Sequence, residues 1–161
     1  MLQEKLKALL GLTTRGNQAP RIHDPVETLR LSYHDLLRLA QQIDAHAERA
    51  PYPHVAQRLR RIAAEKRQSA QALREKLVTW GGEPEAQPLE INSGKNHWER
   101  INRDMEDQKL LESQLLERAS LLAEHAPEVG NLLQQAVAAG LSHKETLLDL
   151  VARADPQAEQ T

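Results

Sequence analysis

Residues 62–84 read IAAEKRQSAQALREKLVTWGGEP, and this stretch decides the fold. Small and apolar residues recur in it at steps of three and four, which is the spacing of one face of an α-helix. Gly81 and Gly82 follow the last of them, and glycine commonly ends a helix. The stretch therefore predicts the greater part of a long helix, running from about His54 to Trp80. Its inward stripe is predicted to consist of Val55, Leu59, Ile62, Lys66, Ser69 or Ala70, Leu73 and Leu77.

Another helix is predicted directly before this one. Asp24 is suited to cap it, with Pro25 at its first position and Glu27 at its third, and Pro51 ends it. Its inward stripe also steps by three and four without a break. This stripe is Val26, Leu29, Tyr33, Leu36, Ala40, Ile43 and Ala47.

Two more helices are predicted in the second half of the chain. One starts near Asn96, where Glu99 completes a capping-box pattern, and the other runs from Pro127 to about Ala154. The stripe of the first is Ile101, Met105, Gln108, Glu112, Leu115, Ala119 and Leu122. The stripe of the other is Leu133, Ala136 or Val137, Gly140, His143 or Lys144, Leu147, Leu150 and Val151.

The connections between these helices differ in length. The first two helices are joined around Pro51 and Pro53 and the last two at His125 and Ala126, whereas residues 83–96 form a long connection without a helical period. Such a connection can travel the length of a bundle, which makes the helices that it joins roughly parallel. With few aromatic residues, the core must be built from Leu, Ile, Val and Ala. The sequence therefore predicts an all-α four-helix bundle with a long crossover between its second and third helices.

Residues 62–84 and the stretch HKETLLDLVARADP at 143–156 resemble the ferritin-like superfamily of four-helix bundles, of the rubrerythrin and bacterioferritin type. The resemblance lies in the helical period and in the way the helices end, and it covers residues 25–156. It implies two helical hairpins joined by one long crossover. It also implies iron or manganese as the cofactor of any member that keeps the family's di-metal centre.

The metal ligands of that family are largely replaced in this chain. The family carries a Glu on the first and third helices and Glu-x-x-His on the second and fourth. At the positions on the last three helices, the resemblance puts Lys66, Ser69, Gln108, Gly140 and His143. Of these only His143 suits a metal, and Glu112, one turn beyond Gln108, is the other weak candidate. The resemblance therefore implies a degenerate metal site.

The inward position of Lys66 is itself a prediction. An alternative alignment would use Glu65 and Gln68 as the pair on the second helix, but it would turn that helix's leucine face to solvent. A buried lysine needs a partner, and Glu112 is the carboxylate on an inward stripe. We expect Lys66 to pair with Glu112 inside the bundle. The alternative is that both side chains extend along their aliphatic stems to the bundle edge.

Composition excludes several other classes of function. The 161 residues include 21 basic and 23 acidic ones, and the basic cluster at residues 58–61 reads as a solvated helix face, so a nucleic-acid partner is not expected. The chain has no cysteine, and no run reaches the ~20 apolar residues of a membrane span. A cytoplasmic location is the expectation. The remaining histidines are predicted at helix ends or off the stripes: His23, His34, His46, His54, His97 and His125.

The N-terminal residues carry a separate signal. Leucines recur at helical spacing within residues 1–12, which predicts a short amphipathic helix, followed by a linker at 13–24. This helix is expected either to pack on its own bundle or a neighbouring subunit, or to dock on a protein partner or a membrane surface. The bundle itself is expected over residues 25–156, with a tail at 157–161.

Three functions remain open from the sequence, of which the third and weakest is a membrane-peripheral stress protein anchored by residues 1–12. The first is a non-catalytic ferritin-like bundle without a cofactor, acting as a protein-interaction or scaffold module and associating as a homodimer. The second is a metal-binding protein or oxidoreductase with a displaced iron or manganese site. That site would be built from His143 and Glu112, with Glu65 or Glu27.

Overall fold

The computed structural model describes residues 24–84 and 88–154. In these residues the chain is all-α, with no strand and four helices: α2 (Pro25–Glu48), α3 (Pro53–Thr79), α4 (His97–Leu122) and α5 (Pro127–Arg153). The prediction of four long helices is confirmed. The predicted N-terminal helix at 1–12, most of the linker at 13–24 and the tail at 157–161 lie outside the described residues.

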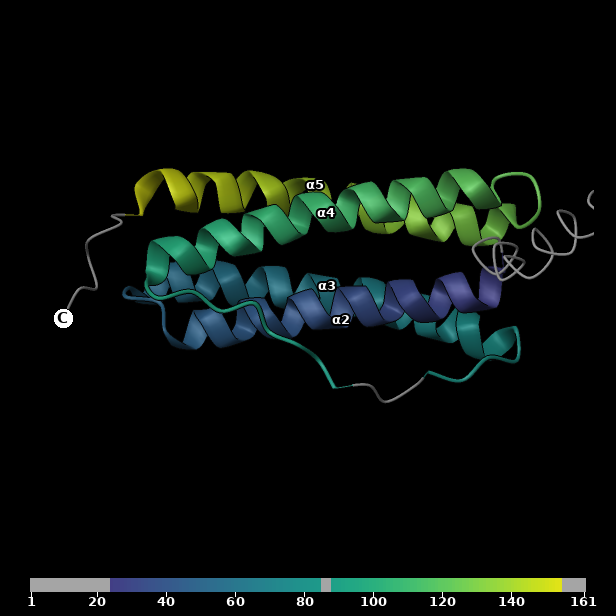
Figure 1. Ribbon diagram of the computed structural model, residues 1–161, viewed down its shortest axis with the longest axis horizontal. Coiled ribbons are helices and arrows are strands. Elements are labelled where there is room, and N and C mark those ends of the chain that lie inside the picture. Colours follow the sequence, from purple (N-terminus) through teal and green to yellow (C-terminus); the bar gives the residue numbers. More distant parts are fainter. Residues whose placement is uncertain (1–23, 85–87, 155–161) are drawn as a thin grey trace, which may run out of the picture.

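The four helices form two hairpins that lie against each other (Figure 1). α2 packs mainly on α3, and α4 mainly on α5, while the hairpins meet through α2 with α4 and through α3 with α5. In Figure 1, α3 and α4 run in the same direction along the long axis. The interior between the hairpins is therefore lined by one face of every helix.

The helix ends follow the capping signals of the sequence. The Asp24 side chain accepts a hydrogen bond from the backbone N–H of Val26 at 3.0 Å, and the Asn96 side chain accepts one from Glu99 at 2.8 Å. After α3, Gly81 adopts a φ of +82°, which glycine reaches without steric cost. The N–H of Gly82 then bonds to the carbonyl of Leu77 at 2.9 Å, which closes the helix end in a Schellman motif.

The core is aliphatic, as the composition predicts. Most residues of the four predicted stripes are buried, and His143 rather than Lys144 points inward on α5. Some members of these stripes are only half-buried, namely Val26, Tyr33, Ser69, Met105, Glu112, Val137, Lys144 and Val151. The buried set also contains polar side chains at the centre of the bundle, and these define the candidate site.

The connection between α3 and α4 lies along α2 where it is described (Figure 1). The carbonyl oxygen of Glu83 accepts a hydrogen bond from Arg30, and that of Glu90 accepts one from Arg38. The N–H of Asn92 donates to the side chain of Gln42 at 2.8 Å. Among the described helices, none has both the length and the apolar character needed to cross a membrane.

Candidate functional site

Lys66 lies at the centre of the bundle with a relative exposure of 2%. α3 directs it inward because it occupies the stripe position between Ile62 and Ala70, which are both buried. Its Nζ donates a short hydrogen bond to Oε1 of Gln108 on α4 and lies 3.2 Å from Nδ1 of His143 on α5. A single amino group thus joins three helices in the interior of the bundle.

His143 continues this chain of contacts toward the surface. Its Nε2 lies 2.7 Å from Oε2 of Glu65, which is half-buried on α3. Because an ammonium has only donors, Nδ1 of His143 must accept from Lys66, and the ring proton then resides on Nε2 and points to Glu65. Both nitrogens of this neutral imidazole are therefore occupied.

Burial shifts the pKa values of these groups. Desolvation lowers the pKa of Lys66 to about 7, while the nearby carboxylates of Asp104 and Glu65 act in the opposite direction. Burial and the positive charge of Lys66 lower the pKa of His143, against the contribution of Glu65. The hydrogen bond from His143 is the main cause of a lowered pKa at Glu65. This cluster can therefore bind and release a proton near neutral pH.

Gln108 is held from both ends. Its Oε1 accepts from Lys66, and its Nε2 donates to the carbonyl oxygen of Gly140 at 3.3 Å. A Cβ atom at position 140 would lie 2.7 Å from that amide nitrogen, closer than van der Waals contact permits. The glycine in the middle of α5 thus leaves room for the Gln108 amide.

The structure brings together four of the five residues that the resemblance placed at ligand positions: Lys66, Gln108, Gly140 and His143. Ser69 is half-buried one turn further along α3 and takes no part in these hydrogen bonds. The preferred alignment of α3 agrees with this arrangement, because Lys66 is buried and Gln68 is exposed. Glu65, which belonged to the less favoured alignment, nevertheless joins the cluster from its edge through His143.

The predicted pairing of Lys66 with Glu112 is wrong. Glu112 bonds instead to Nζ of Lys144 at 2.8 Å, and both side chains lie at the outer edge where α4 meets α5. Helical spacing places Glu112 on the side of α4 that faces α5, but this side also borders solvent. The alternative prediction was that both side chains extend to the edge of the bundle. It is correct for Glu112 and wrong for Lys66.

The cluster does not fit a metal ion. Divalent metals require lone pairs from carboxylates or imidazoles, whereas Lys66 presents protons and its ammonium form repels cations. Both nitrogens of His143 are engaged, one by Lys66 and the other by Glu65. Within residues 24–84 and 88–154, no three His, Asp or Glu side chains gather in a group that could hold a metal.

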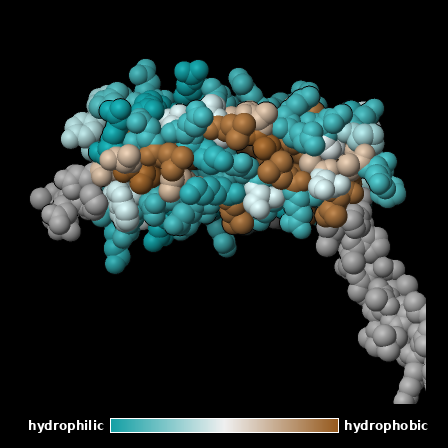
Figure 2. Space-filling view, turned by 90° about the horizontal axis from the view of Figure 1, so that it is seen from above, coloured by the Kyte–Doolittle hydropathy of each residue, from teal (hydrophilic) through white to brown (hydrophobic). Residues whose placement is uncertain are grey.

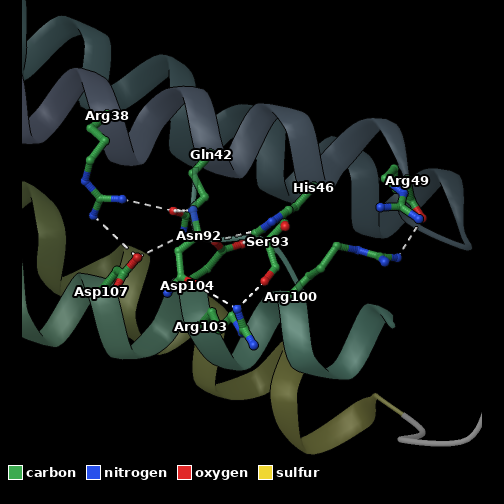
Figure 3. Close-up of polar contacts among 10 residues, drawn as sticks. All are labelled: Arg38, Gln42, His46, Arg49, Asn92, Ser93, Arg100, Arg103, Asp104 and Asp107. Carbon is green, nitrogen blue, oxygen red and sulfur yellow. Dashed lines mark hydrogen bonds and ion pairs between the residues drawn. The ribbon is translucent and has the colours of Figure 1, made fainter. Parts of the chain in front are cut away.

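A second buried polar cluster joins α2 to α4 (Figure 3). Nδ1 of His46 lies 2.8 Å from both carboxylate oxygens of Asp104, which has no exposed surface. Nε2 of Gln42 donates to Asp104 at 2.8 Å and to Asp107 at 3.0 Å. Burial raises the pKa of Asp104, while its bonds with His46 and Gln42 oppose that shift. Nε2 of His46 is buried and meets no hydrogen-bond partner within the described part of the chain.

This second cluster also holds the connection between α3 and α4. The Oε1 atom of Gln42 accepts from Asn92 and from Arg38, and Arg38 reaches Asp107 at 3.4 Å. Arg103 on α4 donates to the side chain of Asn92 at 2.8 Å (Figure 3). The connecting segment is therefore fixed to both hairpins through side-chain hydrogen bonds.

Sequence reasoning missed the second cluster. His46 and His97 were among the histidines predicted at helix ends or off the stripes, yet both are buried. The spacing contained the signal: His46 follows the buried Ile43 by three residues, and Asp104 follows the buried Ile101 by three. A polar residue at that spacing lies beside the apolar stripe, where it can turn toward a neighbouring helix.

A surface cleft of about 260 Å³ lies outside the His143–Glu65 contact. It opens between α3 and α5 and is lined by Arg58, Arg61, Ile62, Glu65, Ser142, His143 and Thr146. Arg58 is bound to Asp149 at 2.8 Å, and Arg61 to Glu65 at 3.1 Å, so the charges of the rim are largely neutralised. Lys66 is not part of this lining, because His143 stands between it and the cleft.

Comparison with known proteins adds no family assignment. No model of a protein family matches this chain, and no curated protein matches it.

Proposed function

We propose that this protein is a non-catalytic ferritin-like bundle that serves as a protein-interaction module, in which Lys66 takes the place of a di-metal centre. The two hairpins, the parallel course of α3 and α4 and the connection along α2 support the ferritin-like topology (Figure 1). The buried cluster supports the loss of metal chemistry. The apolar side chains exposed on α4 and α5 support the interaction role.

The observation that carries this proposal is the position of Lys66. Three residues at expected ligand positions converge on one another, and the one at their centre is Lys66, whose ammonium form donates hydrogen bonds to the other two. A divalent metal placed there would face this ammonium in a medium of low dielectric, where repulsion is strongest. The polar groups of the cluster bond to one another, which favours a closed core over an open coordination site.

Metal uptake tests the proposal. We expect the purified wild-type chain to hold less than about a tenth of an equivalent of Fe(II), Mn(II) or Zn(II) after incubation and desalting, with no change in melting temperature. Elemental mass spectrometry and calorimetry provide the two measurements. One or two equivalents bound by the wild type, with a raised melting temperature, would overturn the proposal.

A variant that puts carboxylates at two of the replaced positions tests whether the residues now present there are the reason that the wild type binds no metal. Lys66→Glu combined with Gln108→Glu removes the cation and places two carboxylates beside His143 and Glu65. We expect this variant to bind about one equivalent of Zn(II) or Mn(II) and to gain thermal stability from it. Gln68→Glu combined with Ser69→Glu, which also adds two carboxylates but places them on α3 outside the cluster, is the control and is expected to bind none.

One observation favours the alternative of a displaced metal site. Glu65 and His143 meet at 2.7 Å beside an open cleft, and a carboxylate and an imidazole form part of a ligand set. Glu112 and Glu27 do not join them, because Glu112 is bound to Lys144 and Glu27 to Arg30. Metal uptake by the wild type that is lost in His143→Ala would establish this alternative.

A further inference from the structure

Exposed apolar side chains on α5 are arranged symmetrically about one lysine. Leu141 and Leu148 lie three residues before and four residues after Lys144, and their exposures are 47% and 44%. Val137 and Val151 lie seven residues before and after it, and both are half-buried. Steps of three, four and seven keep all five side chains on one face of the helix.

α4 contributes the matching half of this surface. Glu112 binds Lys144 across the groove between the two helices. Leu116 follows Glu112 by four residues with an exposure of 46%, and Met105 precedes it by seven and is half-buried. Figure 2 looks onto this side of the molecule and shows apolar surface running along it in patches separated by polar side chains. We call this surface the α4/α5 face.

The α4/α5 face is nearly self-complementary. Because α4 and α5 run antiparallel, a Leu116, Val137 and Leu141 group lies on one side of the ion pair, and a Met105, Leu148 and Val151 group lies on the other. A two-fold axis that lies in the contact plane and runs parallel to α4 and α5 above the ion pair sets each apolar group on the same group of a second copy. The same operation brings Glu112 over Lys144 of the second copy, so the charges of two facing copies attract each other.

We propose that the α4/α5 face is the contact surface for a second copy of this chain, with a two-fold axis that runs parallel to the helices above the Glu112–Lys144 pair. This inference rests on the proposed function and names its partner. The apolar groups at either side of the ion pair supply the buried surface, and the central charges fix the orientation of the two copies. The seven-residue repeat of Val137, Lys144 and Val151 is also the spacing by which helices pack along one another.

The α2/α4 side of the bundle does not have this pattern. Leu31 and Leu110 are exposed there at 47% and 55%. They are separate from each other and lie beside ion pairs such as Arg118 with Asp35 at 2.7 Å. These two leucines are therefore matched controls for substitutions on the α4/α5 face.

Light scattering coupled to size-exclusion chromatography tests the surface with the full chain. We expect the wild type to be a dimer that dissociates on dilution. Leu141→Glu and Leu148→Glu are each expected to raise the dissociation constant by at least about tenfold, because they place a charge in the apolar groups. Leu31→Glu and Leu110→Glu are expected to leave it within about twofold.

Mixing two charge-reversed variants tests the two-fold axis itself. Lys144→Glu puts two acidic residues at the axis, and Glu112→Lys puts two basic residues there, so each variant alone is expected to be monomeric. An equimolar mixture is expected to form a heterodimer, because the acidic pair of one chain then faces the basic pair of the other. Circular dichroism confirms that both variants remain folded before they are mixed.

Three results would overturn this inference. The first is a wild type that stays monomeric. The second is a dimer unaffected by Leu141→Glu and Leu148→Glu, or one that the mixed variants fail to restore. The third is a monomeric full chain that dimerises when residues 1–12 are removed, since the chain's own N-terminal segment would then occupy the face. None of these results bears on metal uptake, so the proposed loss of the di-metal centre would stand or fall separately.

Discussion

At the scale of single residues, the proton held by Lys66 couples folding to pH. The folded chain releases this proton at a pKa of about 7, whereas the unfolded chain keeps it up to 10.5. Between these values the unfolded state binds more protons, so the folded state gains stability as pH rises, by up to about 1.4 kcal/mol per pH unit. The charged form is the destabilising one.

Urea unfolding of the wild type and of Lys66→Met from pH 6 to pH 10 measures this coupling. We expect the stability of the wild type, relative to the variant, to be lowest at pH 6 and to rise steadily above pH 7. The variant cancels the contributions of the other titrating groups, which both proteins share. A difference that does not change with pH would show that Lys66 titrates alike in both states.

Gly140 gives a second prediction at this scale. Glycine in a helix interior is less stable than alanine by about 1 kcal/mol, yet a Cβ here would meet the Gln108 amide. We expect Gly140→Ala to destabilise the wild type by about 1–2 kcal/mol, because the amide must give up its hydrogen bonds. In a Gln108→Ala background the same change is expected to stabilise by about 0.5–1 kcal/mol. Denaturant unfolding of the four proteins completes this double-mutant cycle, and equal effects in both backgrounds would contradict it.

The sequence predicted the inward positions of most of these residues but not all of their hydrogen-bond partners. Helical spacing was sufficient to place Lys66, Gln108 and Gly140 inward, because each lies on a stripe of buried leucines and alanines, but it left open whether His143 or Lys144 points inward. It could not choose the partner of Lys66. Spacing fixes the face on which a side chain lies but not its depth, and Glu112 lies on the edge of that face where Lys144 is closer.

At the scale of elements, Gln42 is the link between α2, α4 and the segment that connects the hairpins. Its side-chain amide is fully buried and makes four hydrogen bonds: two with Asp104 and Asp107 of α4, one with the N–H of Asn92 and one with Arg38 of its own helix. We expect Gln42→Leu to destabilise the protein by about 2–3 kcal/mol, because Asp104 and the N–H of Asn92 would each lose a partner. Gln41→Leu, on the exposed neighbouring residue, is the control and should change stability by less than about 0.5 kcal/mol. Chemical unfolding compares the two variants, and equal effects would contradict the role of Gln42.

The helices themselves were predictable almost to the residue. Prolines at the first turn, the caps at Asp24 and Asn96 and the glycines after α3 are local signals, and the structure follows them. The path of residues 83–96 was predicted only in outline. It depends on hydrogen bonds to Arg30, Arg38 and Gln42, which are distant from the connecting segment in sequence.

At the scale of the whole molecule, each hairpin contains one tryptophan. Trp80 lies at the end of α3 and Trp98 in the first turn of α4. Because both polar clusters join the hairpins, we expect them to unfold together. Fluorescence of Trp80→Phe and Trp98→Phe, each reporting on one hairpin, should give denaturation midpoints that coincide with those from circular dichroism on the same variant. Midpoints that differ from the circular dichroism curve would show that the hairpins unfold separately.

The two buried clusters also determine how far the hairpins can slide past each other. An aliphatic interface between antiparallel helices offers similar packing after a shift of one turn, about 5.4 Å. Such a shift would separate Lys66 from Gln108 and His143, and Asp104 from His46. The slipped states would therefore lose the hydrogen bonds of both buried clusters. The buried polar residues thus favour one axial alignment of the two hairpins among those that apolar packing alone would allow.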